Sequence, residues 1–371
     1  MTPPDTIPAA ASRGGGRNFK RHRGFKKSKM AISPAERSVG ASLLMRIAEL
    51  RAWLFLILLV VFFEVWARIA YGNTFILNSY NLQSISVFAT APLLLALGQT
   101  FVIISAGIDL SLGFVMGLAS VVAAHSANYA LVSLGMPPAA AMLAGILASV
   151  VIAIIPGLVN GWLIAYLRVP PFIGTLGMYG VARGSAYLFA GGMTIAVTND
   201  WYSAIGNNRV LGVPVLVILT AIACLIMHYL LSQTRFGQHT YAMGASQAAA
   251  RRAGISIRGL TMKIYLLSAI MGGVAGALYT GRFSAGAPQA GEPLLLDSIA
   301  AVVIGGASLF GGSGNIAGTV AGALVIAVIQ YGLVFIDVQP FWQFIAVGAV
   351  IIVSVLVDQT QRRYLGGRQV E

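Results

Sequence analysis

The chain has 371 residues, of which 57% are hydrophobic and only 9% charged, and its formal net charge is +13. A soluble globular domain carries about 25% charged residues, so this composition excludes water as the main solvent of the fold. The single cysteine, Cys224, excludes an intrachain disulfide. Because the basic residues lie mostly between apolar runs, the positive charge indicates membrane topology and not nucleic-acid binding.

Residues 1–45 are basic and show no hydrophobic period, which predicts a disordered cytoplasmic tail. The apolar run that follows, 52–70, is longer than the apolar region of a signal peptide and lacks a small-residue cleavage site. We therefore expect it to be an uncleaved first membrane span.

Ten apolar segments follow one another along the chain. A bilayer core about 30 Å thick needs about 20 apolar residues per helix, and most of the segments approach that length. They are 52–70, 82–104, 110–127, 142–167, 172–191, 213–231, 264–283, 299–310, 316–335 and 341–357. The eighth is glycine-rich and short for a complete span. We expect an all-α polytopic membrane protein with about ten transmembrane helices over 46–360 and a second tail over 361–371.

The loop 232–262 contains four arginines and no acidic residue, which predicts a cytoplasmic location. With an even number of spans, both termini are then cytoplasmic too. The loops 192–212 and 284–297 are expected outside, and they carry Asp200, Glu292 and Asp297 against one basic residue, Arg209. Charge and span count therefore predict the same orientation.

The sequence contains no G-x-x-x-x-G-K-[ST] phosphate loop and no H-E-x-x-H zinc motif, and its four histidines are scattered. We therefore expect neither catalysis nor a metal site. Two classes of membrane protein stay open at this point. The first is an ion-coupled secondary transporter, and the second, with less support from the sequence, is a membrane-embedded enzyme.

Charges inside membrane spans are costly and often functional. Glu64 and Arg68 are spaced i, i+4, which favours an ion pair over a role in transport. Asp109 stands between two apolar runs, and a helix cap is its expected role. For Arg183, a hydrogen bond to a polar solute and snorkelling to the outer surface are equally compatible with its position.

Two further patterns concern short segments of the chain. The Ala-rich stretch 246–253 predicts a short helix within the basic loop, although the positive-inside rule alone could explain its arginines. The segments 102–113 and 302–312 look alike, which indicates either an internal repeat or the small residues that recur where membrane helices pack closely.

Four long motifs are recognisable, in this order: GQTFVIISAGIDLSLG (98–113), VNGWLIAYLRVPPFIGTLGM (159–178), TRFGQHTYAMGASQAAARRAGI (234–255) and LDSIAAVVIGGASLFGGSGNIAGT (296–319). With them the chain resembles permease subunits of ribose-type ABC sugar importers, a group related to branched-chain amino acid permeases. The likeness covers about 82–358.

This resemblance implies a multi-pass protein of the bacterial inner membrane that pairs with a second permease, identical or paralogous. It implies cytoplasmic ATPase subunits that hold ATP and Mg, and a periplasmic solute-binding protein that delivers a monosaccharide or polyol. The chain itself would bind no cofactor and hydrolyse nothing. Its other contacts would be with membrane lipid.

The resemblance also implies roles for residues. The family's ATPase-coupling segment matches Gly244, Ala249, Ala250, Arg251, Ala253 and Gly254, and Arg252 beside them could meet acidic groups of the ATPase. The expected positions in the translocation pathway are Asn160, Phe172, Thr175 and Arg183. Gly177 and Gly306 are expected to allow close helix packing.

Overall fold

The computed structural model describes residues 34–339 and 341–366. The chain divides into two units, residues 1–44 and 45–371. The first helix begins at Pro34, inside the segment that the sequence assigned to the tail, and residues 1–33 of that tail lie outside the described part. At the other end, the last helix continues to Gly366.

The described residues are mostly helical. The helices are α1 (Pro34–Tyr71), α2 (Ser79–Ile104), α3 (Leu112–Asn128), the π-helix η1 (Tyr129–Ser133), α4 (Pro138–Ala165), α5 (Pro171–Phe189), α6 (Asp200–Asn207), α7 (Val215–Gln233), α8 (Arg235–Ala245), α9 (Gln247–Arg252), α10 (Ile257–Phe283), α11 (Glu292–Ile304), α12 (Ile316–Phe335) and α13 (Phe341–Gly366). Four two-residue strands accompany them: β1 (Ile195–Ala196), β2 (Arg209–Val210), β3 (Val213–Pro214) and β4 (Ala285–Gly286).

Each of the ten predicted segments overlaps a helix. Within the described residues, seven helices are long and apolar enough to cross a membrane: α1 from Ala52, α2, α3 with η1, α4, α7, α10 and α12. Helices α5, α11 and the apolar part of α13, Phe341–Leu356, are shorter or less apolar. The eighth segment was placed too late, because α11 already begins at Glu292 and ends at Ile304, before the glycines.

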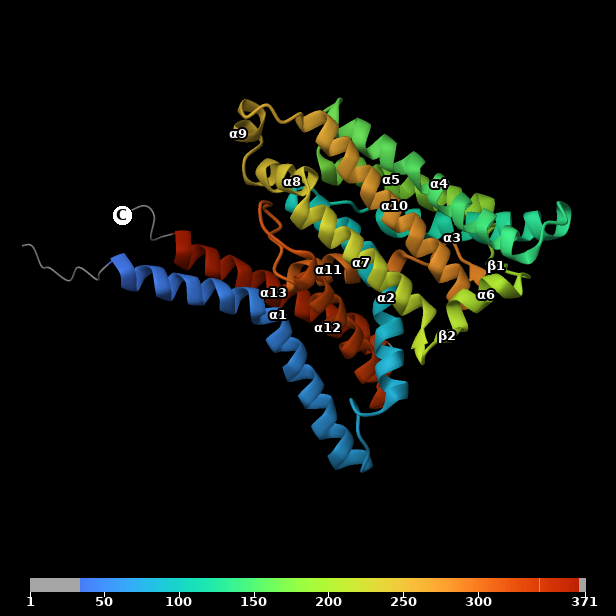
Figure 1. Ribbon diagram of the computed structural model, residues 1–371, viewed down its shortest axis with the longest axis horizontal. Helices are drawn as coiled ribbons and strands as arrows, with labels where there is room; N and C mark the ends of the chain where they lie inside the picture. The colour runs from blue at the N-terminus through green and yellow to red at the C-terminus, as the bar shows by residue number, and fades with distance from the viewer. Residues whose placement is uncertain (1–33, 340, 367–371) are drawn as a thin grey trace, which may run out of the picture. The chain divides into compact units, whose positions relative to one another are not determined.

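Helices α2 and α10 bury residues along most of their length, and α10 runs alongside α4 and α3 (Figure 1). Glycine lets these backbones approach closely. A Cβ placed on Gly98 of α2 would lie 2.9 Å from the Cα of Ser268 in α10. In lipid, close van der Waals packing of this kind holds helices together, because no hydrophobic force acts between them.

Small structures occupy the two ends of these helices. Figure 1 shows α8 and α9 at one end and β1, β2 and α6 at the other. Strand β1 pairs antiparallel with β4, with Ile195 opposite Gly286, so the two long loops that were predicted outside are joined to each other. Strands β2 and β3 form a second short pair.

Helices α2 and α11 end in turns of the same type. Ala106 and Gly306 have positive φ values of 64° and 95°. In each turn the N–H of this residue donates to the carbonyl three residues before it, and the N–H of the next, Gly107 or Ala307, donates to the carbonyl five residues before it. This is a Schellman-type helix end. The segments 102–113 and 302–312 thus look alike because they share this backbone geometry. Gly306 supplies the positive φ of the second turn. We name residues 105–111 the first break and residues 305–315 the second break.

Candidate functional site

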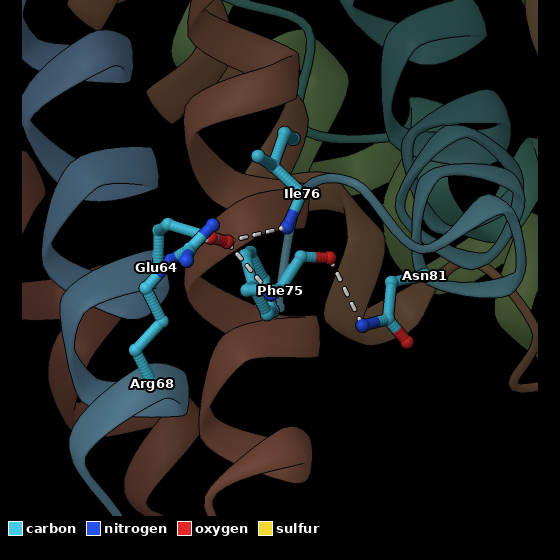
Figure 2. Close-up of polar contacts among 5 residues, drawn as sticks. All are labelled: Glu64, Arg68, Phe75, Ile76 and Asn81. Carbon is cyan, nitrogen blue, oxygen red and sulfur yellow. Dashed lines mark hydrogen bonds and ion pairs between the residues drawn. The ribbon is translucent and has the colours of Figure 1, made fainter. Parts of the chain in front are cut away.

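Glu64 of α1 joins that helix to the loop that follows it (Figure 2). Its Oε1 accepts a hydrogen bond from Nε of Arg68 at 2.7 Å, which confirms the predicted ion pair. Its Oε2 accepts from the backbone N–H groups of Phe75 and Ile76 at 2.7 and 3.0 Å. Asn81 at the start of α2 continues the chain of contacts by donating to the carbonyl of Phe75 at 3.0 Å. Glu64 therefore has a structural role in the α1–α2 connection.

This geometry predicts an order of thermal stability. Glu64→Ala removes the acceptor of three donors, and two of these are backbone N–H groups that are costly to leave unpaired. Arg68→Ala removes only one half of a partly exposed ion pair, which contributes little. In a melting assay of the purified protein, Glu64→Ala should lower Tm clearly and Arg68→Ala only slightly. Equal melting temperatures for the two variants would contradict the proposed role of Glu64.

The first break contains a buried polar cluster around Asp109, whose side chain is 1% exposed. Its Oδ1 accepts from the backbone N–H and the Oγ of Ser111, at 3.0 and 2.6 Å. Its Oδ2 accepts from Oγ of Ser268 in α10 at 3.1 Å, and Nε2 of Gln99 donates to the Asp109 carbonyl. The N-cap of α3 is Ser111, and α3 has no side-chain cap among the described residues, so the prediction that Asp109 caps a helix is wrong: its carboxylate instead fixes the turn two residues before the helix.

Two of the predicted pathway residues join this cluster. Nδ2 of Asn160 in α4 donates to Oγ of Ser111 at 2.9 Å. Oγ1 of Thr175 in α5 lies 3.2 Å from the carbonyl of Ile108 and shares its proton with the carbonyl of Pro171 in its own helix, at 2.9 Å. Both side chains are buried, so in this conformation they contact the first break and not an open pathway.

The other two pathway residues lie on the open face of α5. Phe172 and Arg183 are exposed, and the guanidinium carbon of Arg183 lies 5.3 Å from the centre of the Phe114 ring. Gly177 is also exposed, and no atom lies within 4 Å of a Cβ placed on it. Close packing by Gly177 therefore has no partner helix within the described part of this chain.

The predicted short helix in the basic loop is confirmed as α9. Oγ of Ser246 accepts from the N–H of Ala249 at 3.2 Å and so caps its start. The helix ends at Arg252, Ala253 is its C-cap, and Gly254 then takes a positive φ of 82°. One side of α9 is buried through Ala250, while Ala249, Ala253, Arg251 and Arg252 are exposed. Arg251 and Arg252 thus present a short basic surface at one end of the helices.

Helix α8 connects this surface to both breaks. The N–H of Gly312 donates to the carbonyl of Ile104 at 2.8 Å, so the two breaks are themselves joined. Gly244 packs on this junction: a Cβ there would overlap the carbonyl oxygen of Ile104 and lie 2.6 Å from the nitrogen of Gly312. The hydroxyl of Tyr241 donates to the carbonyl of Gly314 at 2.6 Å. Burial raises the pKa of Tyr241, so its hydroxyl keeps the proton that it donates.

The sequence did not single out Tyr241, Gln99 or Ser268. Gln99 lies in the same motif as Asp109 and Tyr241 in the motif 234–255, which is a weak signal, whereas Ser268 stands in ordinary helical sequence. Among the described residues, no group of three His, Cys, Asp or Glu side chains could hold a metal ion.

Apolar helices interrupted by buried polar turns, with a basic surface attached at one end, are the architecture of a membrane transport component. The chain belongs to the family of permease components of branched-chain amino acid transport systems, whose model matches residues 81–355. It is a multi-pass permease of the bacterial inner membrane, and the predicted resemblance is confirmed.

Several relatives are similar over most of their length. The chain is 36% identical to the fructose import permease protein of Rhizobium meliloti, over 71% of this chain and 74% of the relative. It is 37% identical to the ribose import permease protein of Bacillus subtilis strain 168, over 72% and 80%. It is 35% identical to the galactose/methyl galactoside import permease protein of Haemophilus influenzae, over 78% and 89%. No solved structure matches the chain. These relatives favour the sugar-importer interpretation over the ion-coupled alternative.

Proposed function

We propose that this chain is the transmembrane subunit of an ATP-binding cassette importer and forms the pathway for a monosaccharide or related polyol. The names of the relatives describe them as import permeases for fructose, ribose and galactose, which supports this solute class. The observation that carries the proposal is the exposed basic surface of α9, which α8 connects to the first and second breaks. Such a surface suits a cytoplasmic partner that delivers mechanical work.

The partner is an ATPase that holds ATP and Mg, and a periplasmic binding protein delivers the solute. Arg251 and Arg252 are exposed at the end of α9 and suit acidic groups on the ATPase. The small residues Ala249 and Ala253 let the helix enter a groove of that partner. When ATP binding closes the two ATPase subunits on each other, their movement displaces α9.

The proposed topology has ten spans, formed by α1, α2, α3, α4, α5, α7, α10, α11, α12 and α13, with both termini in the cytoplasm. Two contacts support it. The β1–β4 pair joins two loops that this topology places outside. Helix α8 contacts Ile104 and Gly312, at two breaks that it places on the cytoplasmic side.

The second permease, identical or paralogous, packs against the open face of α5. One face of α5 is buried within the chain, whereas Gly177, Gly180 and Gly184 on the other have no atom within 4 Å of a placed Cβ. Small residues of this kind suit close approach of a second membrane helix. Phe172 and Arg183 lie beside them, where an aromatic face and a guanidinium can contact a sugar.

The proposal is tested by purifying the tagged chain from native membranes in mild detergent and identifying what accompanies it. An ATPase should co-purify, and the complex in liposomes, with its binding protein, should accumulate sugar only when ATP is supplied on the ATPase side. Uptake by the chain alone, driven by an imposed proton or sodium gradient, would overturn the proposal in favour of an ion-coupled carrier.

A further inference from the structure

We infer that the first break is a mechanical relay, which carries the displacement of α8 to the adjoining end of α5 and so opens the solute pathway there. This inference rests on the proposed function, because the ATPase supplies the motion. It assigns roles to Tyr241, Asp109 and Thr175 as positioning residues.

The input end of the relay is the junction of α8 with Ile104. Gly244 leaves no room for a side chain between α8 and this carbonyl, and Gly312 donates to the same oxygen. Tyr241 adds a hydrogen bond to Gly314 in the second break. Most of these contacts involve backbone atoms, so a shift of α8 cannot be absorbed by rotation of a side chain. The two breaks must move with α8.

The middle of the relay is held rigid by Asp109. Its carboxylate accepts from Ser111 and Ser268, and its carbonyl accepts from Gln99. Hydrogen bonds that are buried away from water are electrostatically stronger than exposed ones, and together they fix the path of the chain from Ile104 to Ser111. A displacement of Ile104 therefore reaches Ser111, seven residues further along the chain.

The output end is the carbonyl of Ile108, which lies 3.2 Å from the Thr175 hydroxyl near the start of α5 and shares its proton with the carbonyl of Pro171, 2.9 Å away in the same helix. Asn160 of α4 is tied to the same segment through Ser111. Helix α5 has an open face and several glycines without neighbours, so contacts from this chain hold the helix on one side only. Because α5 also carries Phe172 and Arg183, its movement changes the pathway directly.

Three buried polar atoms beside the break are unpaired in this conformation. Oε1 of Gln99, Oδ1 of Asn160 and the hydroxyl of Tyr265 are buried and have no hydrogen-bond partner among the described residues. Buried unpaired polar atoms are costly, and each is an acceptor or donor that a second arrangement of the break can pair. Two discrete arrangements of one packed segment are what a conformational relay requires.

The test measures the coupling ratio, the number of solute molecules imported per ATP hydrolysed, for the complete importer in liposomes. Thr175→Val keeps the shape of the side chain but removes its hydroxyl, and the ratio should fall because the contact with the Ile108 carbonyl is lost. Thr175→Ser restores the hydroxyl and should restore most of the ratio. The matched control is Thr220→Val in α7, whose buried hydroxyl has no partner among the described residues, and its ratio should stay at the unsubstituted value.

Tyr241→Phe tests the other end and should lower the ratio similarly, whereas Tyr229→Phe, at an exposed position of α7, should not. Since Tyr241→Phe removes only a hydroxyl from α8, it decides the question if Thr175→Val does not fold. Unsubstituted ratios for both Thr175→Val and Tyr241→Phe, or an equal loss in Thr175→Ser, would overturn the relay and leave the proposed function standing. Absence of ATP-driven uptake by the unsubstituted complex would overturn the proposed function and the relay with it.

Discussion

Replacing Gly244 by alanine is expected to abolish ATP-driven uptake, although the protein still inserts in the membrane. The added methyl group would overlap the carbonyl of Ile104 and crowd the nitrogen of Gly312. Both neighbours are backbone atoms that are already hydrogen-bonded to each other, so α8 has to move away from both breaks. Overpacking of this kind costs about 1–3 kcal/mol of stability. Uptake into liposomes and Tm of the purified protein measure the two consequences.

Gly259→Ala is the matched control, because it adds the same methyl group in the same loop. Its nearest neighbour would be the Ser256 hydroxyl at 3.3 Å, a contact that a shift of a few tenths of an ångström relieves. This variant should transport like the unsubstituted protein. Uptake by Gly244→Ala at the level of Gly259→Ala would contradict the idea that α8 must be seated on both breaks.

The membrane helices were predictable because an apolar run of span length has few alternatives in lipid. The boundaries failed where polar residues belong to a helix. Helix α11 begins at Glu292 and includes Asp297, whose carboxylate accepts a hydrogen bond from Gln330 of α12 at 2.8 Å. Helix α10 begins at Ile257, before Arg258 and Lys263, although the apolar run starts only at Ile264. A hydropathy pattern cannot show that a buried or terminal charge is paired or solvated.

The candidate site was predictable only where it is local. The short helix α9 depends on neighbours a few residues away and was confirmed, whereas the cap predicted for Asp109 was wrong, because Ser111 occupies that position. The contacts that unite the site are distant in sequence: Ser268 reaches Asp109 across 159 residues, and Tyr241 reaches Gly314 across 73. A single sequence carries no record of such pairs. It therefore placed Asn160 and Thr175 in a pathway, without their contacts to the first break.

Reversing both charges at the end of α9, with Arg251→Glu and Arg252→Glu, is expected to lower ATP-driven uptake by about tenfold or more. Both side chains are exposed, so the change leaves the fold intact and acts on the partner. If the arginines face acidic groups of the ATPase, the reversal brings like charges together, which costs several kcal/mol at an interface. Uptake by the reconstituted complex and co-purification of the ATPase are the measurements.

The control is a second double reversal, Arg235→Glu with Lys263→Glu, at exposed positions of α8 and α10 outside α9. It makes the same change in net charge next to the same membrane surface, so any loss through altered insertion or topology appears in both variants. A loss confined to the α9 variant indicates that these two arginines meet the partner, and a rise in its uptake at high salt would identify the repulsion as electrostatic. Equal uptake by both variants would show that the arginines of α9 serve orientation in the membrane alone.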